Sequence, residues 1–464
     1  MSINLNINKE NFHDDLMEIA RVFVPFLKAE QDVNIEMLVT ETDVTSVKIV
    51  SEDYNYNKLQ ILNEDKGARA KSKLKRVCKV LLYDFFNFIT GENLPYGALT
   101  GIRPTKLFYD TTAQGKDPYK YFVEDLRVSV AKTNLIKSII ENQRGIYGKN
   151  EKEVDVFVNI PMCTSRCSYC SFISAEIGKI AKLVKPYVEL LRKEIELTKQ
   201  IVKQQNLTVR SVYIGGGTPT SLPLECFESV LKECSFECKE FTVEAGRPDT
   251  ITKEKLDIME ACGVTRISIN PQTFNQKTLD LIGRKHTIED IYSKFRLARN
   301  YPFLINMDLI AMLPEETLEE FKNSVNCAVA LNPDNITVHT LALKAGSVLK
   351  ETNYDNTSKM AEEMVDYSNL AITSAGYIPY YMYRQKYMSG NLENVGYCKP
   401  KTACIYNIDI MEETHSIIAN GAGAIAKKVI NSENRIERLA NPKGIEVYLE
   451  RAETILQKKK DFFA

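Results

Sequence analysis

From residue 154 onward, short runs of strand-forming residues alternate with amphipathic helical stretches. The first helical stretch is the clearest, because Leu183, Tyr187, Leu190 and Leu191 recur at the spacing of a buried stripe on a helix. Strand–helix units in series predict a parallel sheet with right-handed crossovers. Six such units rather than eight favour an α/β fold that forms an open, partial (β/α)6 barrel over a closed one. The strand-like runs are Val154–Ile160, Val209–Ile214, Glu240–Val243, Thr265–Ile269, Leu304–Ile310 and Asn335–Val338.

The chain has 464 residues, which is enough for two or three domains, since single cores stop growing near about 250–300 residues. Residues 1–150 mix strand-like runs (Val33–Val39 and Thr45–Val50) with a helical stretch, Lys66–Ile89, and predict an α+β N-terminal domain. Residues 151–375 hold the strand–helix core. Residues 376–464, which begin with an aromatic stretch, are expected to form a small C-terminal region.

Composition argues against several classes of function. Basic and acidic residues nearly cancel, 60 against 61, so the chain is not built to hold a polyanion. The stretch Lys66–Ile89 begins with several lysines, but such runs are usually solvated helix faces, so nucleic acid is not an expected partner. The first residues lack a secretory signal, and no apolar run reaches the ~18 residues of a membrane span. Eleven cysteines then indicate a reducing compartment and a cytoplasmic location.

Reactive residue types follow the ends of the predicted strands. Loops at the carboxyl ends of parallel strands meet on one face of the sheet, where α/β folds place their chemistry. These residues therefore predict an active site at that face. In strand order they are Cys163, Cys167 and Cys170; the glycine turn Gly215–Pro219; Glu244; Asn270 to Gln272; Asp308; and His339 with Thr340.

The three cysteines are the strongest of these signals. Their C-x3-C-x2-C spacing can wrap a 4Fe–4S cluster and leave one iron without a protein ligand, open to a small chelating cofactor. Structural zinc is the main alternative, but zinc normally needs four nitrogen or sulfur ligands. The next candidates downstream, Cys226 and His286, are far along the chain. The number of ligands therefore favours the cluster over zinc and over three unligated thiols.

The remaining features are weaker on their own. Gly215–Pro219 is not a Walker loop, because no Gly-Lys-Ser/Thr follows, but its glycines would let backbone approach a ligand closely. Gly421–Ile425 resembles a dinucleotide-binding turn without the expected acidic residue. Glu244 and Asp308 could accept hydrogen bonds from an ammonium and from ribose hydroxyls, or could be solvated carboxylates. His339 is expected to be packed rather than catalytic.

In this order, the motifs resemble the radical S-adenosylmethionine (SAM) superfamily and, within it, the oxygen-independent coproporphyrinogen III oxidase family. The matching segments are NIPMCTSRCSYC, GGGTP, EAGRP, RISINPQTFNQKTLDLIGRKH and MDLIAMLPEET, spread over about residues 150–430. The block that ends in LTGIRPTKL is similar to the coproporphyrinogen dehydrogenase branch, which carries an extra N-terminal domain. The resemblance implies a radical SAM (β/α)6 core.

The resemblance also implies cofactors and partners. A 4Fe–4S cluster would be held by Cys163, Cys167 and Cys170, and one SAM would chelate its open iron. Some members of the family bind a second SAM. A reducing electron donor such as flavodoxin or ferredoxin, and a tetrapyrrole substrate or heme, are the implied partners. The positions matching the first SAM are Gly216, Glu244 and the backbone near Ile425; those matching the second are Tyr169, Gly217, Thr218, Gln272, Arg284, Asp308 and the backbone near Ala342.

The reaction of the family is an oxidative decarboxylation without oxygen. A radical formed from SAM takes a hydrogen from a propionate side chain, carbon dioxide leaves, one electron passes to an acceptor, and a vinyl group remains. Two such steps convert coproporphyrinogen III to protoporphyrinogen IX in heme biosynthesis. Arg103, Arg384 and Lys386 are candidate partners for the propionates, which an arginine could hold in bidentate fashion.

The chain departs from the oxidases at several positions. Phe157 and Asn159 stand where the oxidases carry Tyr and His, and Phe172 stands where they carry another cysteine. The Cys-x-Phe pattern at Phe172 is similar to radical SAM heme chaperones, but the His-Asn-x-x-Tyr-Trp motif of those proteins is absent, since the chain has no tryptophan. Two alternatives stay open: a heme chaperone or heme-binding protein, and a methyltransferase or other tetrapyrrole-modifying enzyme.

Overall fold

The computed structural model describes residues 2–27, 32–42, 44–62, 68–171, 175–342, 358–386, 388–433 and 435–464. The chain forms two compact units. The first contains Met1–Ser138 with the segments Thr357–Lys359 and Arg384–Leu392, and the second contains the rest. No helix among the described residues is both long enough and apolar enough to cross a membrane.

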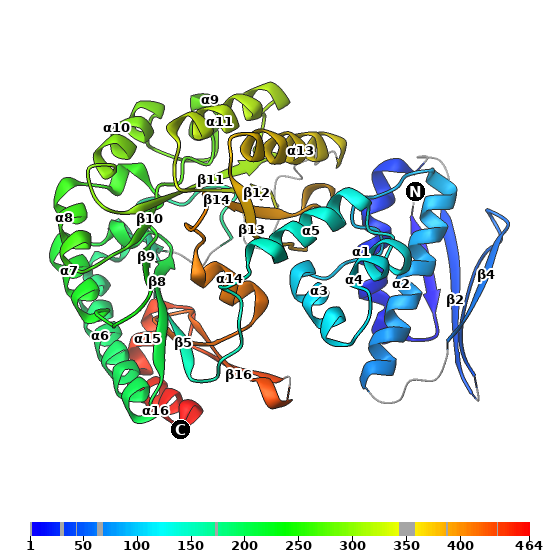
Figure 1. Cartoon of the computed structure of the whole chain (residues 1–464), viewed down its shortest axis with the longest axis horizontal. Coiled ribbons are helices and arrows are strands. Elements are labelled where there is room, and N and C mark those ends of the chain that lie inside the picture. Colours follow the sequence, from blue (N-terminus) through cyan, green and yellow to red (C-terminus); the bar gives the residue numbers. More distant parts are fainter. Residues whose placement is uncertain are drawn as a thin grey trace. The chain divides into compact units, whose positions relative to one another are not determined.

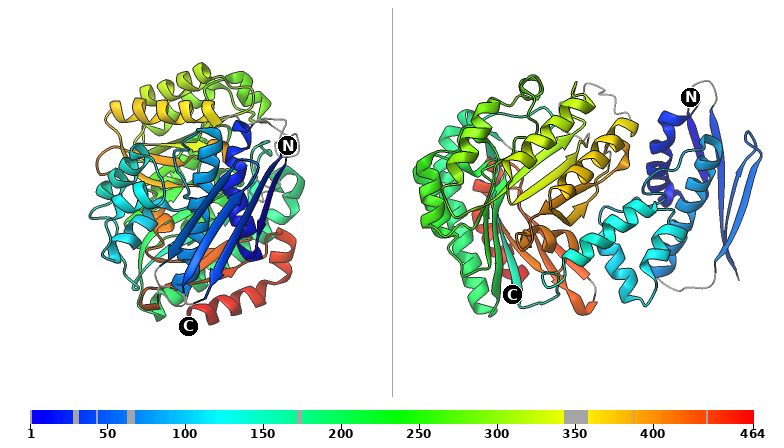
Figure 2. Two further views of the ribbon diagram at one scale, coloured as in Figure 1. Left: turned by 90° about the vertical axis from the view of Figure 1, so that its right-hand side faces the viewer. Right: turned by 45° about the horizontal axis from the view of Figure 1, so that its top comes forward.

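In the first unit, helices cover one face of a four-stranded sheet (Figure 1, Figure 2). The strands lie in chain order, with the first pair parallel and the others antiparallel. Alternate residues of the second strand are buried in one core with the helices, as the two-residue period of a strand requires. The predicted α+β character and both predicted strands are confirmed; residues 66–67 of the predicted helix lie outside the described ranges. The elements are β1 (Ile3–Ile7), α1 (His13–Phe23), β2 (Val33–Glu41), β3 (Thr45–Ser51), β4 (Tyr56–Leu62) and α2 (Ala68–Thr90).

Three further helices follow, α3 (Pro104–Ala113), α4 (Pro118–Lys120) and α5 (Val130–Asn142). Arg384 belongs to the first unit because its guanidinium, 2% exposed, donates to the carbonyl oxygens of Leu99 and Asn391. The guanidinium also stacks 4.0 Å from the ring centroid of Tyr96. Its hydrogen-bonding capacity is therefore used within the protein.

The second unit is built on an eleven-stranded sheet in which the middle seven strands are parallel. All six predicted strands are present and neighbour one another in the predicted order, which confirms the α/β class with a parallel sheet. They are β5 (Glu153–Ile160), β8 (Thr208–Gly216), β9 (Glu240–Val243), β10 (Arg266–Ser268), β11 (Leu304–Ala311) and β12 (Asn335–Thr340).

Helices between these strands line the outer side of the curved sheet in Figure 1, while α14 (Ile405–Glu412) lies on the inner side. The helix that the leucine and tyrosine spacing predicted is α6, and its Tyr187, Leu190 and Leu191 are buried. The outer helices are α6 (Ala181–Gln204), α7 (Leu224–Glu233), α8 (Lys253–Ala261), α9 (Gln276–Leu281), α10 (Ile288–Ala298) and α11 (Leu318–Leu331).

Residues after 376, expected from the sequence to form a region of their own, extend both ends of the same sheet. Beside β12 lie two antiparallel strands, and beside β5 lies the seventh parallel strand followed by two antiparallel ones. These strands are β13 (Ile378–Tyr383), β14 (Asn394–Cys398), β15 (Ser416–Asn420), β16 (Ile425–Ile430) and β17 (Arg435–Ala440). The accompanying helices are α13 (Ser358–Ser374), α15 (Ile445–Glu450) and α16 (Ala452–Phe463).

An aromatic layer fills the inner side of the sheet. Tyr406 of α14 stacks on Tyr213 of β8 with ring centroids 4.4 Å apart, and on Phe157 of β5 at 6.1 Å. Phe157 and Tyr213 are direct neighbours across the two strands. Helix α14 therefore packs against side chains from the middle of the sheet and closes its inner face.

Below this layer, the start of α14 is held by buried charge. Glu240 of β9 accepts hydrogen bonds from the Ile405 amide at 3.0 Å and from the Cys404 thiol at 3.1 Å. A carboxylate at a helix start complements the positive end of the helix dipole. Arg266 of β10 donates to the same carboxylate at 3.3 Å and to the Thr402 carbonyl at 2.9 Å, so neighbouring groups also bind this buried ion pair.

Removing the ring that joins α14 to the sheet should destabilise the second unit. Tyr406 is 5% exposed, so Tyr406→Ala is expected to lower the free energy of unfolding by about 3–5 kcal/mol, as large-to-small core changes do. The matched control, Leu370→Ala on α13, removes a side chain that is 65% exposed and should change it by less than about 0.5 kcal/mol. Urea unfolding of the three proteins measures both values, and equal effects would contradict this packing role.

Candidate functional site

The three cysteines lie on a loop that follows β5 and is tethered by backbone bonds. The loop begins in the short strand β6 (Met162–Cys163), which pairs with β7 (Ala175–Glu176). The Thr218 amide donates to the Met162 carbonyl at 2.7 Å, and the Ser168 amide to the Ile282 carbonyl at 3.0 Å. The loop is thus held from the β8 turn and from the turn after α9. Phe172, which distinguishes the chain from the oxidases in sequence, lies outside the described residues.

The three thiols are free and are not gathered around a single point. Cys167 is buried and Cys163 and Cys170 are half-buried, and none of the eleven cysteines, all described, forms a disulfide. Within the described ranges only Asp155, Asp409 and His415 bring three possible ligand atoms within 4.8 Å of one another; the three thiols do not. Thiolates on one zinc would lie about 3.8 Å apart, given zinc–sulfur bonds of about 2.3 Å. Thiolates on separate irons of a cube need a wider spacing, which agrees with this loop.

Two buried arginines hold the thiol loop and add positive charge beside it. The Arg247 guanidinium donates to the Ser165 hydroxyl at 2.9 Å and to the carboxylate of Asp249, and lies 3.9 Å from the sulfur of Cys167. Asp249 in turn accepts a hydrogen bond from Thr164 at 3.2 Å. The sequence contained a signal for Arg247, because it lies in the EAGRP segment. Only the structure shows that Arg247 and Asp249 bind the thiol loop.

Arg284 is the second arginine. Its guanidinium donates to the carbonyls of Gly246 and Asn270 at 3.2 and 3.1 Å and to the Tyr169 hydroxyl at 3.0 Å. Burial alone would lower the pKa of Arg284, but Tyr169 and the Cys167 thiol beside it raise it above its ordinary value. Arg284 therefore stays charged and joins the ends of β9 and β10 to the thiol loop.

The glycine turn after β8 needs glycine at two positions. Gly216 has a φ of +107°, and a Cβ there would lie 1.9 Å from the Asn159 side-chain oxygen. A Cβ on Gly217 would lie 2.5 Å from the Met162 carbonyl oxygen. The turn therefore packs its backbone directly against β5 and the thiol loop, and the Thr218 hydroxyl lies 3.4 Å from the Cys163 sulfur.

Glu244 follows β9 and lies at the carboxyl ends of the parallel strands, on the same side of the sheet as the glycine turn. The Tyr213 hydroxyl donates to one carboxylate oxygen at 2.5 Å. Burial, together with the carboxylate of Asp308, raises the pKa of Glu244 to about 7, although the Tyr213 hydroxyl and the Gly216 amide oppose the shift. A side chain with such a pKa can change its charge near neutral pH, which is unusual for a glutamate.

Gln272 and Asp308 are joined through their backbones. Gln272 has a φ of +69°, and its amide donates to the Asp308 carbonyl at 2.9 Å. The Asp308 carboxylate accepts from the Asn306 side chain at 2.8 Å and lies 3.7 Å from His339. His339 also lies 3.1 Å from the Tyr383 hydroxyl, with its side chain 25% exposed, so it is packed against partners but still reaches solvent.

Three buried polar atoms near β10 have no hydrogen-bond partner within the described part of the chain. They are the Ser268 hydroxyl, the Asn270 side-chain oxygen and the Gln272 side-chain oxygen. Such atoms cost free energy unless a ligand or water satisfies them. They lie on residues at or just after the end of β10, beside the carbonyl that Arg284 binds, and so favour a polar ligand at this edge.

Ala342 and Ile425 lie after the neighbouring strands. Ala342, beyond β12, is the last described residue before a gap, and the preceding Leu341 amide donates to the Ala311 carbonyl at 3.1 Å. Ile425 is 47% exposed and begins β16 after a turn at Gly421, which follows β15 beside β5. Because a strand rather than a helix follows that turn, Gly421–Ile425 is not a dinucleotide-binding turn.

The candidate propionate partners have other contacts. Arg384 is bonded to carbonyl oxygens within the first unit, as described above, and Lys386 forms an ion pair with Glu18 there. Arg103 precedes α3 in that unit. The assignment of Arg384 as a carboxylate partner is corrected, because its guanidinium is buried and its donors point to backbone oxygens.

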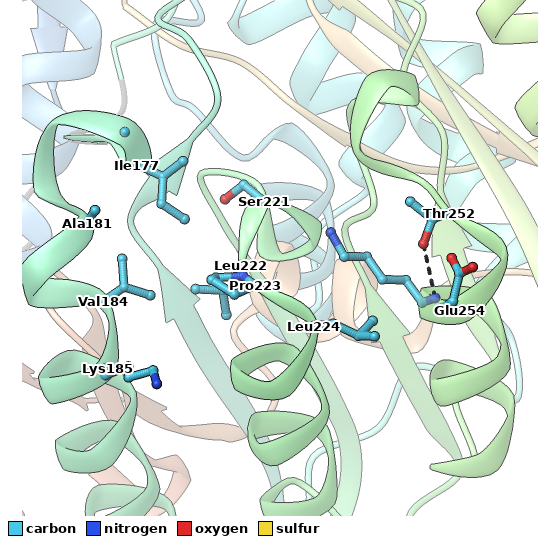
Figure 3. A pocket seen from close by; sticks show the side chains of 12 residues that line it. Ile177, Ala181, Val184, Lys185, Ser221, Leu222, Pro223, Leu224, Thr252 and Glu254 are labelled. Carbon is cyan, nitrogen blue, oxygen red and sulfur yellow. Dashed lines mark hydrogen bonds between the residues drawn. The ribbon is translucent and has the colours of Figure 1, made fainter.

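Two other features do not form part of this edge. A hollow of about 700 Å³ lies at the starts of α6, α7 and α8, lined mainly by aliphatic side chains such as Val184 and Leu222 with Lys185 and Lys255 (Figure 3). It contains none of the candidate site residues.

The buried group of Asp155, Asp409 and His415 already includes a cation, because Arg210 donates to Asp409 at 2.6 Å. We therefore interpret that group as a structural charge network.

The pKa of Glu244 predicts how stability depends on pH. Its folded pKa of about 7 exceeds the ordinary 4.5, so the folded chain binds this proton more tightly, and stability falls as pH rises between those values. Glu244→Gln cannot ionise, so its stability relative to the unchanged protein should rise by roughly 1–3 kcal/mol between about pH 5 and pH 7.5. Urea unfolding of metal-free protein measures the difference, and a difference that stays flat or falls with pH would contradict the assignment.

Comparisons with known proteins agree with this geometry. Residues 159–328 match the radical SAM superfamily. The chain is 37% identical over 413 residues to the oxygen-independent coproporphyrinogen-III oxidase-like protein HemZ of Bacillus subtilis, covering 84% of this chain and 81% of that protein. It is 35% identical over 200 residues to the heme chaperone HemW of the same organism, but covers only 51% of that protein, about half its length.

A solved structure has the same fold. Coproporphyrinogen III oxidase (HemN) from Escherichia coli, described as a radical SAM enzyme, matches with a TM-score of 0.53 at 20% identity, over 68% of this chain and 73% of that one. At this identity the likeness concerns the fold, including the large parallel sheet. Together with the similarity to HemZ over most of both chains, it supports one conclusion: the chain belongs to the radical SAM superfamily and, within it, to the family of oxygen-independent coproporphyrinogen-III oxidase-like proteins.

Proposed function

We propose that the protein is a radical SAM enzyme that carries out oxygen-independent oxidative decarboxylation of coproporphyrinogen III to protoporphyrinogen IX. The observation that carries the proposal is the loop of Cys163, Cys167 and Cys170, anchored by Arg247 and Arg284 at the strand edge where Glu244 lies. The names of the relatives support a tetrapyrrole as the substrate, since HemZ and HemN are both described in terms of coproporphyrinogen.

The residues at this edge fit a 4Fe–4S cluster. Three thiols from one loop, which do not all lie within 4.8 Å of one another, suit three irons of a cube and leave the fourth iron without a protein ligand. Arg247 and Arg284 supply positive charge that offsets the negative charge of the thiolates. When bound, the cluster and SAM would supply the radical chemistry that removes hydrogen from the substrate.

The same edge fits SAM through backbone and carboxylate groups. The half-buried backbone of the turn at Gly216 suits an amino acid group, and Glu244 can accept hydrogen bonds from its nitrogen. Asp308 can accept from ribose hydroxyls, and the unsatisfied oxygens of Asn270 and Gln272 can accept from a further polar ligand. A second SAM, in contact with Tyr169, Gly217, Thr218, Gln272, Arg284, Asp308 and the backbone near Ala342, belongs to the proposal as well.

The inner aromatic layer gives the site its closed side. Phe157, Tyr213 and Tyr406 stack directly below the residues at the strand ends and limit the access of water from that direction. Exclusion of water protects reactive species from side reactions. Substrate would therefore approach from the loop side, and a reducing partner such as a flavodoxin or ferredoxin would deliver electrons to the cluster.

A heme chaperone is the second candidate function. It is favoured by the 35% identity to HemW over 200 residues. A methyltransferase that uses the same edge is a further alternative from the sequence. The lack of tryptophan, and hence of the motif that the chaperones carry, makes decarboxylation the preferred proposal.

One assay separates these functions. Anaerobic protein with reconstituted cluster would be supplied with SAM, a strong reductant and coproporphyrinogen III, and products analysed by mass spectrometry. The proposal predicts loss of carbon dioxide and formation of vinyl groups together with 5′-deoxyadenosine and methionine. Methylated tetrapyrrole would indicate a methyltransferase instead, and stoichiometric heme binding without turnover would indicate a chaperone.

The cluster ligands have a direct test. Substitution of Cys163, Cys167 and Cys170 together by Ala should reduce iron from about four atoms per chain to none, because the thiolates hold the cluster. Cys226→Ala, which removes another buried thiol, is the matched control and should retain the iron. Iron that persists in the triple variant, or zinc in the unchanged protein, would refute the assignment.

Arg247 should affect how firmly the cluster is held. Arg247→Met removes the hydrogen bonds to Ser165 and Asp249 and the cation near Cys167, so a chelator should remove iron about tenfold faster. Arg192→Met on α6 removes a more exposed arginine that pairs with Glu233, and serves as the control. Iron release at the same rate in all three proteins would contradict the anchoring role.

A further inference from the structure

A buried ion pair joins the last helix of the chain to the turn beside β5. Glu194 of α6 and Lys459 of α16 are 0% and 1% exposed, and the Lys459 ammonium lies 2.8 Å from the first carboxylate oxygen of Glu194. Such a pair is stable only if the remaining hydrogen-bonding capacity of both groups is satisfied. The partners that satisfy it therefore show what the pair holds in place.

Three further donors reach Glu194. Its second oxygen accepts from the Gly421 amide at 2.8 Å and from the Tyr448 hydroxyl at 2.6 Å, and its first oxygen accepts from the Asn441 side chain at 2.8 Å. Burial alone would raise the pKa of Glu194, but Lys459 and these neighbours hold it below its ordinary value. The carboxylate is thus ionised and fixes the first amide of the turn.

Lys459 holds the strand that leads into the same turn. Its ammonium donates to the Ala419 carbonyl and to the Asn420 side-chain oxygen, each at 2.7 Å, and both residues are in β15. With the bond to Glu194, all three ammonium donors have partners. Asn441 adds a bond to the Gly421 carbonyl at 3.0 Å, so both polar groups of the Gly421 backbone are bound.

The other side of the turn is fixed to β5. The Tyr187 hydroxyl donates to the Asn159 carbonyl at 2.6 Å and accepts from the Ala422 amide at 3.3 Å, while the Asn159 side chain donates to the Ala422 carbonyl. Gly421 has a φ of +98°, and a Cβ there would lie 2.5 Å from the Asn159 carbonyl oxygen. The turn is therefore pressed against the strand that leads directly to Cys163.

We propose that Glu194 and Lys459 are positioning residues, through which helix α16 holds the turn Gly421–Ala424 where its backbone and that of Ile425 contact SAM. This inference rests on the proposed function and on the family resemblance, which implies that the backbone near Ile425 contacts the first SAM. Neither side chain is proposed to contact SAM directly. Each acts by holding the turn in position. The affinity for SAM therefore depends on the C-terminal helix, although that helix lies outside the strand–helix repeat that carries the cysteines.

The first test compares two substitutions on α16. Lys459→Met removes the ammonium, and we expect the dissociation constant for SAM, measured by anaerobic equilibrium dialysis, to rise about tenfold at unchanged iron content. The kcat for SAM cleavage at saturating SAM should stay close to the unchanged value while KM rises. Ile455→Ala removes a buried side chain of the same helix that is 6% exposed, and should leave the dissociation constant within about twofold.

A second variant and a second measurement cover the case in which Lys459→Met does not fold. Asn441→Ala keeps the ion pair but removes the bond to the Gly421 carbonyl, and should weaken SAM binding in the same direction by a smaller factor. Hydrogen exchange of the Gly421 amide in cluster-free protein measures how firmly Glu194 and Lys459 hold the turn, without any cofactor. It should be faster in both variants than in the unchanged protein and in Ile455→Ala.

The outcomes separate the two proposals. Folded Lys459→Met or Asn441→Ala with unchanged SAM affinity and unchanged Gly421 exchange would overturn the positioning role, as would an equal loss of affinity in Ile455→Ala. If the unchanged protein, with a full cluster, binds no SAM, the proposed function fails and the role in SAM binding fails with it. Faster exchange in the variants would then establish only a structural tie.

Discussion

The buried guanidinium of Arg284 is the interaction on which the arrangement of the site depends. It binds the carbonyls at the ends of β9 and β10 and the Tyr169 hydroxyl on the thiol loop. An arginine keeps its charge when buried, and the two terminal nitrogens of Arg284 donate to acceptors on three loops, so these loops lose the freedom to move apart. Arg247 ties the same loop to Asp249, so the position and the electrostatic environment of the thiols are set by two cations.

The sheet interior changes character along its strands, and this confines chemistry to one end. Toward the amino ends, Glu240 and Arg266 form a buried pair that holds α14; in the middle, Phe157, Tyr213 and Tyr406 stack. At the carboxyl ends, the side-chain oxygens of Ser268, Asn270 and Gln272 lack partners within the described chain. A ligand is therefore expected at that end, since the lower layers are already closed by their own side chains.

Much of this could be predicted from the sequence, because it follows from local periodicity. The six parallel strands and α6 were predictable from residue spacing, and residues directly after a strand, such as Cys163 and Glu244, take their place from the strand before them. Contacts between distant segments could not be predicted this way. In the sequence, Lys459 is one of several neighbouring lysines, Arg384 is a candidate partner for propionates, and β15 is a short apolar run. The groups that bind them lie up to 285 residues away along the chain.

The central claim is that three thiolates hold an iron–sulfur cluster with one iron open to SAM. The most direct measurement is the electron paramagnetic resonance spectrum of the reduced, anaerobically prepared protein, recorded with and without SAM. We expect the signal of a reduced 4Fe–4S cluster that changes its g values when SAM is added, because SAM binds the iron that no cysteine occupies. A cluster signal that SAM leaves unaltered, or protein that holds zinc and gives no signal, would contradict the account.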